Sequence, residues 1–202
     1  MLAGTNAFAQ LSAGLGYINS NLSGQFNGNK QDPENSNGFF AGASYNVGIA
    51  SGLSVAPGAY FSLLTNTSEG GVSVLGISQN SKSTFTEMAL NFPIMANYAY
   101  QLSRDAKVFA FAGPTVHFGL SSKSVTEASG VVSGTSTTDY YDSDSPTFNR
   151  FNLYLGGGIG AQFGSIIVNV GYNYGLMNLY AGSTDNTNYH RANLHIGVSY
   201  AL

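Results

Sequence analysis

The chain has 202 residues, a net charge of −3, no cysteine and only 8% charged residues. Ordinary soluble domains carry about 25% charged residues, and nucleic-acid binding needs a concentrated basic patch, which seven scattered Lys and Arg residues do not supply. The absence of cysteine excludes disulfides, thiolate catalysis and cysteine-type zinc sites. The chain has no run of about 18 apolar residues, which a transmembrane helix would need.

The first residues resemble the end of an export signal. Ala7-Phe8-Ala9 fits the small-residue pattern of a signal cleavage site, although the basic and long apolar parts of a signal are missing. We therefore expect residues 1–9 to be the remnant of an export signal; a merely flexible start is the alternative. Residues 10–202 are predicted to form a single domain.

Eight stretches alternate apolar residues with polar or small ones. Because successive side chains of a strand point to opposite faces, each stretch predicts a strand with one apolar and one polar face. In the last stretch every even position from Ala192 onward is apolar. In chain order the predicted strands are Leu11–Asn19, Phe39–Ile49, Leu53–Thr65, Phe85–Gln101, Lys107–Leu120, Arg150–Phe163, Ser165–Leu179 and Tyr189–Leu202.

The connections alternate between long and short. Three are tight, and four are long and polar and are predicted to be solvated loops: Ser20–Gly38, Asn66–Thr84, Ser121–Asn149 and Tyr180–Asn188. Outer-membrane barrels show this asymmetry, with short periplasmic turns and longer outer loops. A sheet that spans a bilayer must close on itself, because lipid offers no partner for unpaired backbone groups. We therefore expect an all-β fold, an eight-stranded antiparallel up-and-down transmembrane β-barrel. A soluble sandwich could share the alternation, but the polar faces hold Asn, Gly and Tyr in place of Lys and Glu.

Charges and aromatic residues support this interpretation. Thirteen of the seventeen charged residues fall in the predicted connections, and the other four lie near strand ends. A Lys or Arg on the lipid face at mid-membrane would cost about 2–4 kcal/mol. Outward aromatic residues are predicted near the periplasmic rim (Tyr98, Tyr100, Phe163 and Tyr200) and near the outer rim (Phe39, Phe61, Phe118, Phe151 and Tyr174), as expected for two interfacial belts.

Four residues are candidates for a polar cluster at the lumen mouth. Glu87, Arg150 and Arg191 face inward at the outer ends of their strands, and His117 lies at a similar height. An ion-paired cluster could close the mouth, because side chains can fill an eight-stranded barrel; a ligand-binding or proton-linked site is the alternative. The run Gly156-Gly157-Gly158 marks a bend or crowding in the lumen.

The longest predicted loop holds a second candidate site. Asp139, Tyr140, Tyr141 and Asp142 lie amid Ser and Thr residues and would suit an adaptable recognition surface. Together with Asp144, the Asp residues could hold a cation weakly, and a solvated acidic loop is the other interpretation. We expect no metal site and no cofactor.

Three segments resemble a known family: Leu90-Asn91-Phe92-Pro93-Ile94, Tyr98-Ala99-Tyr100, and Val108-Phe109-Ala110-Phe111-Ala112-Gly113-Pro114. They resemble the small outer-membrane β-barrel proteins of Bacteroidetes, the PorT-like and OmpX-like eight-stranded barrels. The resemblance implies an architecture and not an activity. Such barrels usually end in Phe, which looks like part of the signal read by the barrel-assembly machinery, whereas this chain ends in Leu202.

Small barrels of known enzyme families offer a further comparison. Barrels resembling lipid A deacylase carry Ser two residues from His on one strand, but Gly119, Ala192 and Gly197 follow the three His residues at that spacing. A palmitoyltransferase-like barrel would need an apolar lumen, which the inward Asn residues oppose. We therefore expect no enzymatic activity.

These patterns predict a monomer in the outer membrane of a Gram-negative bacterium, in contact with outer-membrane lipid and the barrel-assembly machinery. With four extracellular loops and a plugged polar lumen, it would be a structural or surface-interaction, adhesin-like protein whose partner is an extracellular ligand or envelope protein. The alternatives are a narrow passive pore for small solutes and an accessory subunit of a secretion or envelope-assembly machine.

Overall fold

A computed structural model describes residues 9–74, 77–130, 133–142, 144, 147–182 and 184–202. The expected signal remnant therefore lies, up to residue 8, outside the described residues. The strands in the described part are β1 (Ala9–Phe26), β2 (Asn29–Ala50), β3 (Leu53–Val74), β4 (Ile77–Gln101), β5 (Ala106–Gly130), β6 (Gly134–Asp139), β7 (Phe151–Phe163), β8 (Ile166–Gly175) and β9 (Asn188–Ala201).

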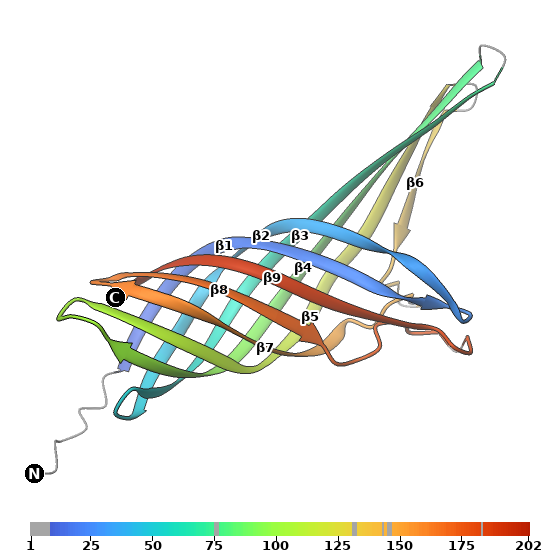
Figure 1. Ribbon diagram of the computed structural model, residues 1–202. Helices are drawn as coiled ribbons and strands as arrows, with labels where there is room; N and C mark the ends of the chain where they lie inside the picture. Colours follow the sequence, from blue (N-terminus) through green and yellow to red (C-terminus); the bar gives the residue numbers. More distant parts are fainter. Residues whose placement is uncertain (1–8, 75–76, 131–132, 143, 145–146, 183) are drawn as a thin grey trace, which may run out of the picture.

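Eight of the strands in the described residues close a ring (Figure 1). Each pairs antiparallel with its neighbour in the order β1, β2, β3, β4, β5, β7, β8, β9, and β9 pairs back with β1. β6 lies outside the ring and pairs only with β5 among the described strands. The predicted eight-stranded up-and-down barrel is confirmed.

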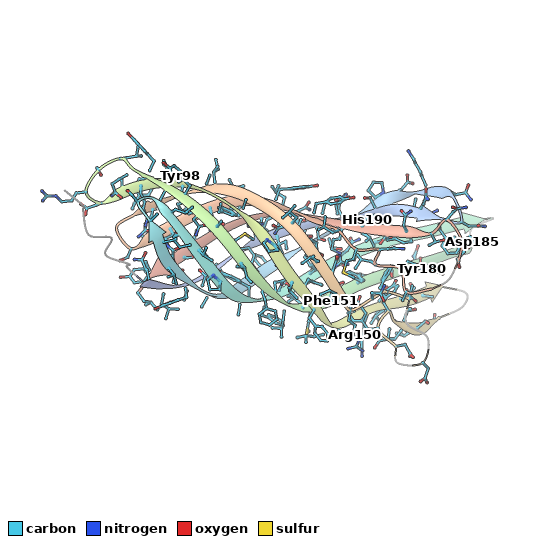
Figure 2. The ribbon with its side chains drawn as sticks, turned by 90° about the horizontal axis from the view of Figure 1, so that it is seen from below. Tyr98, Arg150, Phe151, Tyr180, Asp185 and His190 are labelled. Carbon is cyan, nitrogen blue, oxygen red and sulfur yellow. The ribbon has the colours of Figure 1, made fainter. Side chains whose placement is uncertain are left out.

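The ring carries its apolar side chains outward, as the alternation predicts. In β9, Leu194, Ile196, Val198 and Tyr200 are exposed while Arg191 and Asn193 are buried. The aromatic residues predicted for the two rims are all exposed on the outside, and Figure 2 shows Tyr98 toward the end with the short turns and Phe151 toward the opposite end. Such an outward apolar band between aromatic girdles is the surface that a membrane-spanning barrel presents to lipid.

The height of the ring agrees with a bilayer. The ten residues of β8, at about 3.4 Å per residue and a tilt of about 45°, rise about 24 Å, and the apolar band of such barrels is about 25 Å tall. Within the described residues, no helix is long and apolar enough to cross a membrane.

The first predicted loop, Ser20–Gly38, is wrong. β1 and β2 stay paired as far as Phe26 and Asn29, and they meet in a two-residue turn at Asn27 (φ 49°) and Gly28 (φ 79°). Two consecutive positive φ values are the mark of a type I′ hairpin turn, for which Asn-Gly is the preferred sequence. Both faces of this hairpin meet water, so its sequence shows no alternation of apolar and polar residues. The Asn-Gly pair was the remaining sequence signal for a hairpin.

The second predicted loop, Asn66–Thr84, and the first half of the third, Ser121–Asn149, are also wrong. β3, β4 and β5 continue past the ring, and β6 adds a fourth strand beside β5. We call this the projecting sheet: residues 66–74 of β3, 77–86 of β4, 123–130 of β5, and β6. Its strands extend about 30 Å beyond the ring, and Figure 1 shows it leaving the barrel opposite the end where the C-terminus lies.

The connection between β8 and β9 is irregular in its described residues, 176–182 and 184–187, apart from a bridge between Phe148 and Tyr180. β8 therefore ends at Gly175 and not at Leu179 as predicted. The short turns between β2 and β3, β4 and β5, and β7 and β8 lie at the end of the ring with the C-terminus, whereas the β1–β2 hairpin, the projecting sheet and the β8–β9 connection lie at the opposite end (Figure 1). Because outer-membrane barrels keep their short turns in the periplasm, we infer that the end with the projecting sheet is the extracellular one.

Candidate functional site: a closed outer mouth over a hollow lumen

An ion pair crosses the lumen near its extracellular end. Glu87 of β4 and Arg191 of β9 come from strands on opposite sides of the ring, and these residues are 2% and 5% exposed. Arg191 Nη2 donates to Glu87 Oε2 at 2.9 Å, and Arg191 Nη1 donates to Oε1. This bidentate geometry fixes both the distance and the orientation of the two groups.

Neighbouring side chains complete a layer around this pair. His117 Nε2 lies 3.9 Å from Glu87 Oε1, while its Nδ1 is hydrogen-bonded to Asn91 Oδ1 at 2.8 Å. The His117 ring also meets the buried Tyr154 ring edge-on, with centroids 5.5 Å apart. We call Glu87, His117, Tyr154 and Arg191 the closing layer.

Arg150 does not join the closing layer. It precedes β7 and is exposed, and its Nη2 donates to the Tyr141 carbonyl at 2.7 Å. Its guanidinium also lies 5.2 Å from the centroid of the Tyr141 ring. The structure thus brings together three of the four residues predicted for the mouth. The fourth, Arg150, instead contacts Tyr141 in the segment between β6 and β7.

The segment between β6 and β7, which contains Tyr141, folds over the closing layer. Tyr141 is only 4% exposed, and its burial raises the pKa of its hydroxyl. It packs on Gly119, where a Cβ atom would lie 2.3 Å from the Tyr141 hydroxyl. The Tyr140 ring stacks on Phe148 at 5.3 Å and contacts Phe85 at 5.9 Å; the Phe148 ring in turn contacts Tyr189 at 5.9 Å. We call Phe85, Tyr140, Tyr141, Phe148 and Tyr189 the aromatic lid.

The Asp residues predicted for recognition have local roles in this segment. The Asp139 carboxylate accepts a hydrogen bond from the Tyr141 backbone N–H at 2.9 Å and lies 3.5 Å from Lys123 Nζ. Asp142 accepts from the Asp144 backbone N–H at 2.8 Å. Asp139, Tyr140, Tyr141 and Asp142 therefore shape the turn that carries the lid.

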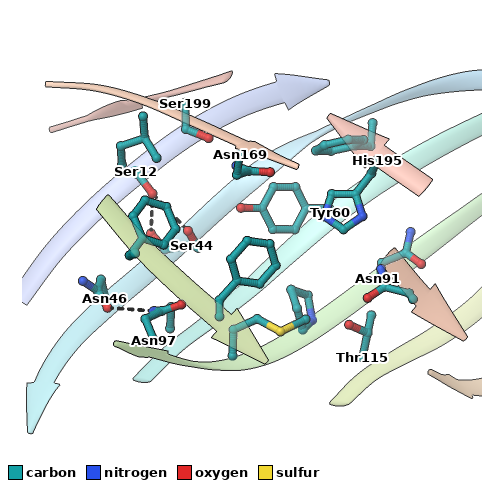
Figure 3. Close-up of a pocket in the computed structure, with 18 of the residues that line it drawn as sticks. Ser12, Ser44, Asn46, Tyr60, Asn91, Asn97, Thr115, Asn169, His195 and Ser199 are labelled. Carbon is teal, nitrogen blue, oxygen red and sulfur yellow. Dashed lines mark hydrogen bonds between the residues drawn. The ribbon is translucent and has the colours of Figure 1, made fainter. Parts of the chain in front are cut away.

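The lumen below the closing layer is hollow. A cavity of about 220 Å³ is lined by inward side chains of all eight ring strands (Figure 3). The sequence predicted a filled polar lumen, and more than half of the residues that line this cavity are Ser, Thr, Asn or Gln. The lumen is nevertheless not filled, and the rings of Phe40, Tyr60, Phe109, Phe111, Tyr154 and His195 lie among the polar side chains. The glycine run does relieve crowding, because a Cβ atom at Gly158 would lie 2.5 Å from the Phe111 ring.

The His residues and the acidic residues are the possible metal ligands within the part of the chain that the structure describes. No group of three or more His, Asp or Glu side chains there could hold a metal ion. His117 is hydrogen-bonded to Asn91, His195 lies among aromatic rings in the lumen, and the His190 ring stacks on Tyr174.

Three solved structures of bacterial surface and outer-membrane proteins align with nearly the whole chain. The crystal structure of Ail, the attachment invasion locus protein of Yersinia pestis, aligns at 11% identity over 96% of this chain and 97% of that chain, with a TM-score of 0.42. Neisserial surface protein A aligns at 13% identity over 96% and 98%, with a TM-score of 0.42. OprG from Pseudomonas aeruginosa aligns at 10% identity over 97% of both chains, with a TM-score of 0.40.

A comparison with curated protein sequences gives no match. A family model, in contrast, covers most of the chain. The model of the outer membrane protein beta-barrel domain matches residues 6–181, which include seven of the eight ring strands. The chain therefore belongs to the outer membrane protein beta-barrel domain family.

Proposed function

We propose that this outer-membrane protein is a non-enzymatic, adhesin-like surface protein and that the projecting sheet is the part that meets its partner. The observation that carries the proposal is that β3, β4 and β5 continue well past the ring and gain a fourth strand. Spanning the membrane requires only the ring. An ordered sheet outside it offers a rigid surface at a distance from the lipid.

The two edges of the projecting sheet are suited to binding. Among the described strands, residues 66–74 of β3 pair only with β4, and β6 pairs only with β5. Each edge therefore presents backbone N–H and C=O groups that can pair with an added strand of another protein.

The faces of the sheet are rich in hydroxyl groups. Ser83 Oγ is hydrogen-bonded to Ser124 Oγ at 2.9 Å and to Thr126 Oγ1 at 3.1 Å. Charges of opposite sign are paired, with Lys82 Nζ 3.2 Å from Glu69 Oε1 and Lys123 Nζ 3.5 Å from Asp139 Oδ2. A partner would therefore be held by hydrogen bonds more than by net charge, and its binding should depend little on salt.

Two other functions have some support. A narrow pore is suggested by the hollow lumen, but the closing layer and the lid oppose it. An accessory role in a secretion or envelope-assembly machine rests on fold analogy alone and would appear as co-purification with large envelope proteins. The proposed placement among the Bacteroidetes barrels rests on the three sequence segments described above. The proposed absence of enzymatic activity rests on the sequence, in which no Ser lies two residues after a His.

The register allows the sheet to be removed cleanly. Asn66 faces Phe85, and Lys123 faces Asp139, so that residues 67–84 and 124–138 can each be replaced by Asn-Gly to close two short hairpins while Phe85 of the lid is kept. As a matched control, residues 23–33 are replaced by Asn-Gly between the paired Leu22 and Glu34. Folding of each variant is checked by heat-dependent gel mobility.

Adhesion of bacteria displaying each variant to epithelial cells and immobilised matrix proteins tests the proposal. We expect the intact chain and the control to adhere and the variant without the sheet to lose adhesion. Equal adhesion with and without the sheet contradicts the role of the sheet. Adhesion of the intact chain no better than that of the empty vector contradicts the adhesin function.

A further inference from the structure

The hollow part of the lumen opens toward the periplasm. Gln10, Asn46, Lys107 and Gln162 line both the cavity and a second hollow at the short-turn end, which also contains Arg104 and Asp105. At the other end, the buried Tyr154 of the closing layer forms part of the wall. The cavity is therefore a blind pocket that a molecule can enter from the periplasmic side.

Aromatic rings form a collar inside this pocket. Phe40 meets Tyr60 edge-on at 5.8 Å and His195 edge-on at 6.1 Å, and His195 lies 6.3 Å from Phe111, which lies 6.2 Å from Phe109. These residues come from β2, β3, β5 and β9, and Figure 3 shows Tyr60 and His195 with the amides that surround the hollow. Such a collar can hold a flat or chain-like apolar body.

Polar atoms without partners lie on one wall of the pocket. Thr115 Oγ1, Asn173 Oδ1 and Asn193 Oδ1 are buried and form no hydrogen bond. The Tyr154 hydroxyl lies beside Asn193 and Arg191 but makes no hydrogen bond of ordinary geometry. Thr115 is paired with Tyr154 across β5 and β7, and Asn173 with Asn193 across β8 and β9, so the four groups form one patch on neighbouring strands.

Such a patch calls for an occupant. More than about 90% of buried polar groups in native structures have a hydrogen-bond partner, and exceptions need an explanation such as an unseen water or ligand. The pocket contains one formally charged residue, Lys107, at its periplasmic rim. Because burying an unpaired charge is costly, the interior favours a neutral molecule.

We propose that the lumen is a periplasm-facing binding site for a small uncharged amphipathic molecule, with a one- or two-ring or short aliphatic body in the aromatic collar and a hydrogen-bonding head on the patch of Thr115, Tyr154, Asn173 and Asn193. The cavity of about 220 Å³ is smaller than the roughly 300–1,000 Å³ of drug-sized sites, which limits the body to this size. This site is independent of the projecting sheet, so the failure of either proposal leaves the other standing.

Two methionines report on the test separately. Met95 lines the cavity, whereas Met88 is exposed on the lipid-facing side of the same strand. The protein with ¹³C-methyl-labelled Met is placed in lipid nanodiscs and titrated with 4-ethylphenol, followed by NMR. We expect a saturable shift of the Met95 methyl, while Met88 follows only the linear partitioning of the phenol into lipid.

Matched variants and probes identify the site. Ala56→Phe fills the cavity and should abolish the saturable shift, and Ala59→Phe, the same change on the exposed outer face of β3, should preserve it. Thr115→Val removes the hydroxyl and should weaken binding about 3- to 10-fold, the range expected for one neutral hydrogen bond. Ethylbenzene, which lacks the head, and 4-ethylbenzoate, which carries a charge, should each bind at least about 10-fold more weakly.

Three results would overturn the proposal. A Met95 shift that stays linear and parallel to that of Met88 means that the pocket holds water only. A saturable shift that survives Ala56→Phe means that the phenol binds elsewhere. Equal affinity after Thr115→Val, or equal affinity of the charged or headless probe, contradicts the assignment of the polar patch.

Discussion

Two buried charges depend on each other in the closing layer. Glu87 and Arg191 are almost inaccessible to solvent and form two hydrogen bonds with each other. Neutralising either side chain therefore leaves the other one charged, buried and unpaired. Breaking a buried pair from one side costs about 3–5 kcal/mol, whereas replacing both groups by apolar residues is often neutral.

We therefore expect Glu87→Gln to lower the free energy of unfolding by about 3–5 kcal/mol and the double change Glu87→Met with Arg191→Met to recover most of that loss. Urea unfolding in lipid vesicles, followed by far-UV circular dichroism, measures both. Glu69→Gln is the control, because its pair with Lys82 is exposed and should contribute less than about 1 kcal/mol. A double variant as unstable as Glu87→Gln would argue against a mutual dependence.

A glycine makes room for the lid. An added methyl group at Gly119 would collide with the Tyr141 ring, while a Cβ atom at Gly134 would meet nothing within 4 Å. Gly119→Ala should displace Tyr141 and cost about 1–3 kcal/mol, as overpacking does, and Gly134→Ala should change little. The same unfolding experiment tests this, together with the NMR resonance of labelled Tyr141. An unchanged resonance in Gly119→Ala would contradict the packing described.

The residues of the closing layer show what a sequence can and cannot predict about a site. Strand parity and height along the strand suffice to align Glu87, His117 and Arg191, because the pleat fixes which face each side chain takes. The prediction for Arg150 is wrong because this residue lies just before its strand, where the pleat no longer determines the direction of the side chain. The lid is unpredictable on the same grounds, since Phe148 lies in an irregular segment and finds Tyr140 only through tertiary folding.

At the scale of the element, the strands divide into a ring portion and an extension. Each ring strand faces lipid on one side and the lumen on the other, so its sequence alternates apolar residues with small or polar ones. This pattern predicted all eight ring strands. The extensions meet water on both faces and lose the alternation, so they resemble loops. Their remaining signal is turn chemistry, as at Asn27-Gly28.

The end of the β1–β2 hairpin should therefore depend on its turn. Gly28 has a φ of 79°, a left-handed conformation that costs other residues about 1–2 kcal/mol. Gly28→Ala should increase hydrogen exchange of the amides in residues 20–26 and leave the ring amides protected. Gly70→Ala serves as control, since Gly70 has no positive φ and a Cβ atom there would make only an ordinary contact. Unchanged exchange in residues 20–26 would show that strand pairing alone holds the hairpin.

At the scale of the whole molecule, the barrel separates two environments. It carries the projecting sheet on the side that we infer to be extracellular, and beneath the lid and the closing layer it keeps the pocket that we propose to open toward the periplasm. A path for ions across the membrane would require both the Glu87–Arg191 pair and the rings above it to separate. We therefore expect the folded barrel to be closed, with its function carried by its surfaces and its pocket.

Ion conductance of the refolded protein in a planar bilayer tests this account most directly, after heat-dependent gel mobility has verified that a barrel has formed. We predict no stepwise current from the folded wild-type protein, and stepwise openings after Glu87→Ala and Arg191→Ala are combined with removal of the Tyr141 side chain. Steady channels in the folded wild-type protein would contradict the closed mouth and make solute passage the primary function.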